Sequence, residues 1–179
     1  MPLRLSLRIF DHEPARPSGA QVWRGGATDL TTRTMIADPP RWLTIDEGSP
    51  VPAERPALRE WMLEQINPGD LPSPENAGGV ILVSMNVDPE REEEFNDWYN
   101  TCYIPGFLQV PGVIRARRFT AIEAQPKYLT VYEFENPDVP DTKEWMAARA
   151  SNPWSRRVRA GMRLDEGSPA VFERIFPKL

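Results

Sequence analysis

A short internal repeat constrains the fold of this chain more than any other feature of its sequence. Residues 40–47 read PRWLTIDE and residues 126–133 read PKYLTVYE, with four identical positions and three conservative replacements. The tripeptide EWM follows the first copy at 60–62 and the second at 144–146, at nearly the same spacing. We therefore expect two copies of one folding unit.

A segment rich in proline and glycine separates the two copies. It reads NPGDLPSPENAGG over residues 67–79, which is a typical linker composition. The sequence thus predicts an N-terminal unit over 1–66, a linker over 67–78 and a C-terminal unit over 79–179. Proline accounts for 20 of the 179 residues, but the prolines fall between apolar segments. They indicate boundaries between elements rather than disorder.

The first half of the C-terminal unit has the pattern of a strand followed by a helix. Residues 80–87 alternate apolar and more polar side chains, which predicts a strand. Asp88 followed by Pro89 is a typical helix start, because Asp accepts N–H bonds at the N-cap and Pro needs no donor at the next position. The pair PG at 105–106 is expected to end this helix. Its apolar stripe is formed at helical spacing by Phe95, Trp98, Tyr99 and Cys102.

The rest of the C-terminal unit completes a β-α-β-β-α-β order. Residues 113–122 and 127–135 predict a hairpin. The sequence DTKE at 141–144 resembles a capping box and predicts a second helix, residues 153–163 are also expected to be helical, and 170–176 form the last strand. This order is the ferredoxin-like unit of α+β proteins. The N-terminal unit is predicted to be an incomplete copy, because residues 12–19 are too short and proline-rich to replace the main helix.

The composition excludes several classes of function. One Cys cannot form an internal disulfide, and one Cys with one His argues against a zinc or iron–sulfur site built by this chain. The net charge of -5 argues against nucleic acid as a partner. No apolar run approaches the roughly 20 residues that cross a bilayer, and the N-terminus has no signal-peptide features, so we expect a soluble, cytoplasmic protein with no membrane partner.

Three segments carry the pattern of a known family: EFNDWYNTCYIP at 94–105, VPGVIRARRF at 110–119 and YLTVYE at 128–133. They resemble the dimeric α+β-barrel superfamily, close to its EthD-like branch. The resemblance implies that ferredoxin-like sheets close into a barrel with helices outside. A homodimer or an intrachain pseudo-dimer would close it. Where the family pattern has a His, this chain has Tyr103.

The resemblance also implies a pocket inside the barrel. We expect Ile81, Val83, Met85, Leu129 and Val131 to face the helices. The opposite strand faces are then predicted to line the barrel with Asn86, Arg115, Arg117, Tyr128 and Tyr132, with Tyr103 at its mouth. Guanidinium and phenol groups in this arrangement suit a small aromatic or lactone acid. The alternatives are arginines that are solvated or paired with Glu133 and Glu135, and tyrosines that only pack in the core.

A proton acceptor for catalysis is harder to identify. Several members of the superfamily that this chain resembles use a His near the barrel mouth as a general base, whereas a phenol with an ordinary pKa near ~10 is a weak base at neutral pH. Tyr103 would act as a base only if a nearby cation lowered its pKa. Otherwise it would donate a hydrogen bond to the substrate. His12 is the only imidazole and would replace the base if its loop approached the pocket; the alternative is an exposed loop histidine.

The sequence therefore predicts a cofactor-independent enzyme of isomerase, lyase or cyclase type. It would act by proton transfer on a small aromatic, polyketide-like or lactone substrate inside the barrel, with no metal or other cofactor. The alternative is a non-catalytic ligand-binding or accessory protein that has lost the family base. A third hypothesis, oxygen-dependent oxidation or haem binding, is weaker because His12 is the only available imidazole ligand.

Overall fold

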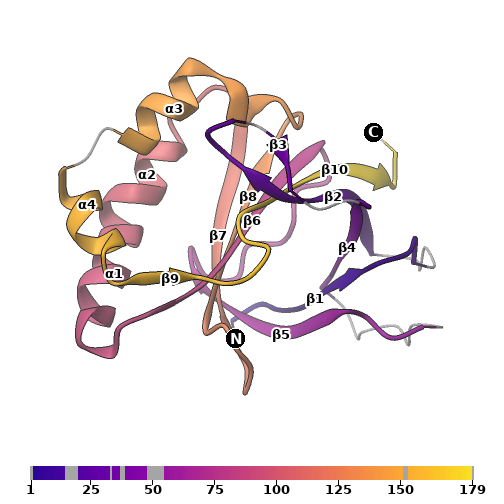
Figure 1. Ribbon diagram of the computed structural model, residues 1–179, viewed down its shortest axis with the longest axis horizontal. Coiled ribbons are helices and arrows are strands. Elements are labelled where there is room, and N and C mark those ends of the chain that lie inside the picture. The colour runs from indigo at the N-terminus through magenta and orange to yellow at the C-terminus, as the bar shows by residue number, and fades with distance from the viewer. Residues whose placement is uncertain are drawn as a thin grey trace.

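A computed structural model describes residues 2–14, 20–32, 34–36, 39–47, 55–150 and 153–178, and its strands close into one barrel (Figure 1). The N-terminal half supplies β1 (Arg4–Phe10), β2 (Gln21–Asp29), the short β3 (Thr34–Met35), β4 (Arg41–Asp46) and β5 (Arg59–Asn67). The C-terminal half supplies β6 (Gly79–Val87), β7 (Val113–Ala121), β8 (Tyr128–Phe134), β9 (Met162–Leu164) and β10 (Ala170–Phe176). The predicted strands 80–87, 113–122, 127–135 and 170–176 are thus confirmed.

The two halves have the same strand order, β5-β1-β4-β2 and β10-β6-β8-β7. Each is the antiparallel sheet of a ferredoxin-like unit, in which the first strand lies between the third and fourth. The halves join where β5 pairs with β7 and where β10 pairs with β2. The barrel therefore closes within one chain, as an intrachain pseudo-dimer.

The helices all belong to the C-terminal half in the described part of the chain, and they cover the outer face of its sheet (Figure 1). A 3₁₀ turn η1 (Pro89–Arg91) leads into α1 (Glu92–Trp98), the π-helical turn η2 (Tyr99–Tyr103) and α2 (Ile104–Phe107). A second group comprises the 3₁₀ turn η3 (Val139–Asp141), α3 (Lys143–Ala150) and α4 (Pro153–Arg159). The fold is α+β, with a complete C-terminal repeat and an N-terminal repeat that lacks helices among its described residues.

Local chemistry explains where these helices begin and end. The N–H of Trp145 donates to Oγ1 of Thr142 at 3.2 Å, so Thr142 caps α3 within the predicted DTKE segment. Asp88 makes no side-chain cap; its carboxylate contacts Arg163 instead. The main helix ends at Phe107, one residue beyond the predicted PG pair at 105–106, and Pro105 occupies the first turn of α2, where a missing N–H is tolerated.

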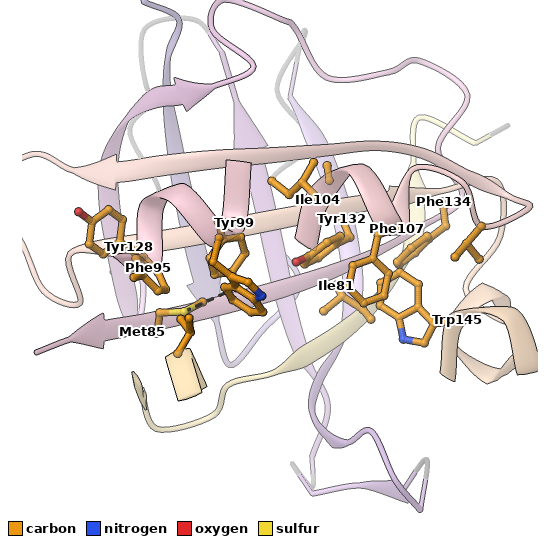
Figure 2. Packing of buried hydrophobic residues seen from close by; sticks show 14 of the residues in the cluster. Ile81, Met85, Phe95, Tyr99, Ile104, Phe107, Tyr128, Tyr132, Phe134 and Trp145 are labelled. Atoms are coloured by element: carbon orange, nitrogen blue, oxygen red, sulfur yellow. Dashed lines mark hydrogen bonds between the residues drawn. The ribbon is translucent and has the colours of Figure 1, made fainter. Parts of the chain in front are cut away.

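The apolar core has two parts. Strands from all round the barrel fill its interior with Leu5, Leu7, Trp23, Leu43, Trp61, Leu129, Val131 and Phe172. The second part lies between the C-terminal sheet and its helices and includes Ile81, Met85, Phe95, Trp98, Tyr99, Phe107, Tyr132 and Trp145 (Figure 2). We refer to these as the barrel core and the helix-side core.

The octapeptide part of the sequence repeat forms equivalent strands in the two halves, whereas the tripeptide part forms different elements. The octapeptide copies form β4 and β8, which take the same position in the two sheets. The EWM copies differ, because 60–62 lie in β5 whereas 144–146 lie in α3. In β5, Trp61 and Leu63 alternate with exposed residues and point into the barrel core, which is strand periodicity.

Two absences apply to the described residues only. No helix there is long and apolar enough to span a bilayer. No group of three or more His, Cys, Asp or Glu side chains there is arranged to hold a metal ion.

Candidate functional site: an aromatic cavity on the helix side

A cavity of about 1030 Å³ lies between the N-terminal half of the barrel and the helix side of the C-terminal sheet. Helices and sheet line it with Tyr99, Tyr103, Phe107, Tyr132, Trp145 and Arg159, and the end of β2 with the turn that follows contributes Thr28 to Thr31. It continues past residues 166–169 to barrel residues that include Trp61 and Phe172. Three exposed apolar side chains, Ile36, Leu58 and Leu164, also belong to its lining.

Aromatic rings form the helix-side wall because they recur every four residues along α1, η2 and α2. Tyr99, Tyr103 and Phe107 therefore share one face, on which Tyr103 meets Tyr99 at 5.3 Å and Phe107 at 4.7 Å between ring centroids. Trp145 from α3 packs on Phe107 at 4.1 Å and edge-on to Tyr132 at 5.5 Å. Figure 2 shows Phe107, Tyr132 and Trp145 gathered above the sheet. A flat aromatic molecule matches such a wall.

Two polar groups of the wall are buried and poorly satisfied. The indole Nε1–H of Trp145 has no hydrogen-bond partner among the described residues, and the hydroxyl of Tyr132 interacts only with that of Tyr99. Tyr99 donates to the soft acceptor Sδ of Met85 at 3.7 Å and also interacts with the hydroxyls of Thr130 and Tyr132. A buried donor without a partner costs about 1–3 kcal/mol, so this wall is short of acceptors.

Arg159 supplies a positive charge beside these rings. Its Nη2 donates to the Tyr103 hydroxyl at 2.8 Å and to the Arg149 carbonyl at 3.2 Å. Its guanidinium carbon lies 5.2 Å from the centroid of the Tyr103 ring, on which Trp98 also stacks at 4.1 Å. Tyr103 is therefore held in place by an arginine and an indole.

The phenols of the cavity are neutral at physiological pH. Burial raises the pKa of Tyr103, and the nearby Arg159 only partly offsets this effect. Burial likewise raises the pKa of Tyr99 and, further, that of Tyr132. These groups act as hydrogen-bond donors or acceptors rather than as bases. The condition under which Tyr103 would become a base, a pKa lowered by a cation, is not met.

The predicted facing of β8 was wrong. Tyr128 and Tyr132 face the helices, where Tyr128 meets Phe95 at 5.0 Å and Tyr132 meets Phe107 at 5.3 Å. Leu129 and Val131, predicted to face the helices, belong to the barrel core. Ile81 and Met85 do lie on the helix side. Of the predicted pocket residues, the structure brings Tyr103 and Tyr132 together in the cavity, whereas Tyr128 lies outside it.

Arg117 points into the barrel, as predicted, but it is bound there by carboxylates. Its guanidinium bonds both oxygens of Glu133 at 2.6 and 3.1 Å, Oε1 of Glu47 at 2.9 Å and Oγ of Ser73 at 2.6 Å. It also donates to the Leu71 carbonyl, so it pins the linker to the barrel. Arg117 and Glu133 are fully buried.

The remaining predicted residues lie away from the cavity. Arg115 donates to the Pro72 carbonyl of the linker. Asn86 accepts the backbone N–H of Lys127 at 2.8 Å. The Nδ1 atom of His12 lies 2.7 Å from the Asp11 carboxylate, and its ring packs edge-on to Phe10. The structure does not bring His12 near Tyr103 in this cavity.

Trp145 and Arg159 are site residues that sequence reasoning missed. Trp145 follows the helix cap, and a Trp at this position predicts a buried residue but does not indicate a role in binding. Arg159 belonged to a basic helical segment whose charged residues are mostly exposed. The pairing of Arg159 with Tyr103, 56 residues away, depends on the tertiary fold.

Neither a protein-family model nor a curated protein matches the chain, whereas several solved structures resemble it. A structure described as a major regulator of staphylococcal pathogenesis is 8% identical, covering 96% of this chain and 99% of that one, with a TM-score of 0.60. An uncharacterised ferredoxin-fold protein from Listeria monocytogenes, related to antibiotic biosynthesis monooxygenases, is 10% identical, covering 100% and 97%, with a TM-score of 0.56.

A candidate monooxygenase from Fusobacterium nucleatum is 11% identical over 96% of this chain and 91% of its own, with a TM-score of 0.54. The fold is a ferredoxin-like α+β barrel. At such low identities these neighbours share the barrel architecture with this chain, and the barrel itself hosts many chemistries.

Proposed function

We propose that this α+β barrel is a cofactor-independent enzyme that binds a flat, aromatic, polyketide-like molecule in the helix-side cavity. The observation that carries the proposal is a pair of buried donors, the Trp145 indole N–H, which has no partner among the described residues, and the Tyr132 hydroxyl, which interacts only with Tyr99. A carbonyl or hydroxyl oxygen of a bound ligand would satisfy them while its rings pack on Phe107 and Tyr103. The volume of about 1030 Å³ suits a molecule of several fused rings.

The donors also favour a particular kind of chemistry. A hydrogen-bond donor beside a ligand carbonyl stabilises the negative charge that develops on its oxygen when a neighbouring carbon loses a proton. This enolate-forming step is shared by the isomerases, lyases and cyclases of our hypothesis. It also serves monooxygenases, to which the Listeria protein is described as related. In that case the enolate carbon would bond to O₂, and loss of water from the hydroperoxide would turn CH₂ into C=O.

A non-catalytic binding protein is the second candidate. It is favoured by Tyr103, which stands where the EthD-like pattern has a His and whose raised pKa keeps it neutral. The carboxylates among the described cavity residues, Asp29 and Glu166, are exposed at its edge. We propose placement in the EthD-like branch on the same motif, and the homodimer stays a prediction.

Calorimetric titration tests the binding proposal. 1-Naphthol should bind more tightly than naphthalene, and Tyr132→Phe and Trp145→Phe should each weaken naphthol binding about 3- to 10-fold, as expected for one hydrogen bond. Tyr128→Phe, on the same strand but outside the cavity, is the matched control and should leave binding unchanged. Equal naphthol affinity in all four proteins would exclude this site.

Turnover separates the enzyme from the binder. A fused-ring ketone with an acidic CH₂ group should exchange its CH₂ protons for deuterium faster with the protein than without it, and Tyr132→Phe should slow this exchange. Oxygen uptake, measured with an electrode, would add the monooxygenase step. Binding without accelerated exchange or oxygen uptake would favour the non-catalytic candidate.

A further inference from the structure

Arg118 is a buried cation without a carboxylate partner among the described residues. It is 1% exposed, on the helix face of β7. Its Nη1 donates to Oδ1 of Asn100 at 2.7 Å and its Nη2 to Oδ1 of Asn96 at 2.8 Å. Both acceptors are neutral amides. They accept hydrogen bonds from the guanidinium, but they carry no negative charge that would neutralise it. A buried charge of this kind is costly unless something else compensates it.

Three aromatic rings give part of the compensation. The guanidinium carbon of Arg118 lies 4.4 Å from the centroid of Tyr99, 5.1 Å from that of Phe95 and 5.5 Å from that of Tyr128. The electron-rich face of each ring attracts a cation, by about 0.5–2 kcal/mol. Ring faces carry no net charge, so the region around Arg118 stays net positive.

The carboxylate of Glu92 lies on this side of the helix layer, but it binds Lys127 and Tyr128 rather than Arg118. Glu92 accepts a bond from Nζ of Lys127 at 2.5 Å and from the Tyr128 hydroxyl at 2.8 Å. Lys127 therefore holds the charge of Glu92 on the outer side of the Tyr128 ring. The same hydrogen bond is the main reason why the pKa of Glu92 is lowered.

We propose that Arg118 is a positioning residue that makes the cavity favour the anionic form of its ligand, a phenolate or enolate of a fused-ring aromatic molecule. This inference rests on the proposed function and narrows its substrate class. Tyr99 connects the two places, because its ring packs on Arg118 and also lines the cavity. The positive charge of Arg118 opposes the rise in the pKa of both Tyr99 and Tyr132, so its field extends to the donors that would hold the ligand oxygen.

The arginines around the cavity act in the same direction, whereas its two lining carboxylates, Asp29 and Glu166, are exposed to solvent. Arg159 donates to Tyr103, and Arg149 donates to the Leu30 carbonyl at 3.5 Å. At the outer edge, Arg59 pairs with Asp165. The Asp29 carboxylate accepts the N–H groups of Thr31 and Thr32, which lower its pKa more than any other contact. Arg41 and Glu166 complete the charged lining.

The experiment uses a nitronaphthol, whose absorbance reports its ionisation, and its methyl ether, which cannot ionise. Absorbance is recorded against pH for the free and the protein-bound probe. Wild-type protein should lower the pKa of the bound probe by one unit or more, which is a tenfold preference for the anion. Arg118→Met should move that pKa back towards its free value, leaving only the part that Arg159 and Arg149 supply, and bind the methyl ether with affinity unchanged within twofold. Arg118→Lys should retain part of the preference.

Arg157→Met is the matched control, because this arginine is 68% exposed and lies outside the cavity lining. It should leave the pKa of the bound probe as in the wild type. If Arg118→Met does not fold, the wild-type titration and Arg118→Lys still decide the question. An unshifted probe in wild-type protein, or a full shift in Arg118→Met, overturns the inference while the proposed function stands. No binding of either probe or ether would instead overturn the proposed function.

Discussion

Arg117 and Arg118 are neighbours in the chain and both are buried, but their side chains lie on opposite faces of β7 and have different kinds of partner. Arg117 points into the barrel and is bound by Glu133, Glu47 and the linker. Arg118 points under the helices and meets amides and ring faces. On the barrel side of β7 the charge of Arg117 is therefore paired with carboxylates, whereas on the helix side the charge of Arg118 is not paired and lies near the cavity with its buried donors. We infer that the ion pairs of Arg117 stabilise the fold and that the helix side binds the ligand.

The largest effect is expected from Arg117→Met. It leaves the fully buried carboxylate of Glu133 without its main partner, which typically costs about 3–5 kcal/mol. Urea unfolding measures the loss. Adding Glu133→Leu should recover much of the stability, because the unpaired charge is then removed. A single variant as stable as the wild type would show that this ion pair does not hold the barrel end together.

The second largest effect is expected in the pH dependence of stability, through the carboxyl group of Glu133. Burial raises the pKa of Glu133 to about 7, against the attraction of Arg117. The folded state then holds this proton more tightly than the unfolded chain, where the pKa is near 4.5, so the contribution of Glu133 to stability is lost as pH rises from about 4.5 through 7. Each pKa unit of difference is worth about 1.4 kcal/mol.

Urea unfolding between about pH 5 and pH 8 tests this sign, with Glu133→Gln as the reference that cannot ionise. The wild type should lose stability relative to Glu133→Gln as pH rises. A relative gain of the wild type over this window would mean that pairing with Arg117, not burial, controls the carboxyl group.

A smaller effect is expected from Arg118→Met, which sharpens the contrast between the two arginines. It removes a buried charge and leaves no ionised partner behind, while it gives up three ring contacts. These terms oppose each other, so we expect a change in the free energy of unfolding of about 1 kcal/mol or less. A loss as large as that of Arg117→Met would place Arg118 among the groups that hold the fold together.

The smallest effect is expected from Glu92→Gln. Its ion pair with Lys127 is 31% and 49% exposed on the two sides, and such pairs contribute about 0.2–1 kcal/mol. If the charge of Glu92 is held by Lys127, the variant should also leave the probe pKa in the cavity unchanged. A further lowered probe pKa would show that Glu92 partly neutralises Arg118.

Much of the C-terminal half could be predicted because its signals are local. The alternation in 80–87 and the proline boundaries depend on neighbouring residues alone. The face of β8 could not be predicted in the same way, because all seven of its residues are buried, so neither set of alternate residues stands out. Bulky Tyr128 and Tyr132 fill the space under the aromatic helix, whereas Leu129 and Val131 fit the narrower barrel.

The role that we propose for Arg118 could not be predicted from the sequence either. The segment RARR at 115–118 offers three guanidiniums, and its pattern does not show which of them meets a carboxylate. That depends on Glu133, which lies across the sheet, and on Glu47, which comes from the other half of the chain. Tyr103 was found from its motif, while its partner Arg159 required the packed helices. Strand β5 could not be predicted for a related reason, because its EWM tripeptide also occurs in a helix of this chain and does not determine the element that it forms.

The most direct measurement follows the indole N–H signals of Trp145 and Trp23 by NMR during a titration with 1-naphthol. Both indole donors are buried and without partners among the described residues, but Trp23 lies in the barrel core and Trp145 in the helix-side core. Signals are assigned with Trp145→Phe and Trp23→Phe. A ligand site on the helix side predicts that the Trp145 signal shifts as its N–H gains an acceptor while the Trp23 signal stays. A shift of Trp23 with Trp145 unmoved would place the ligand inside the barrel and contradict the account.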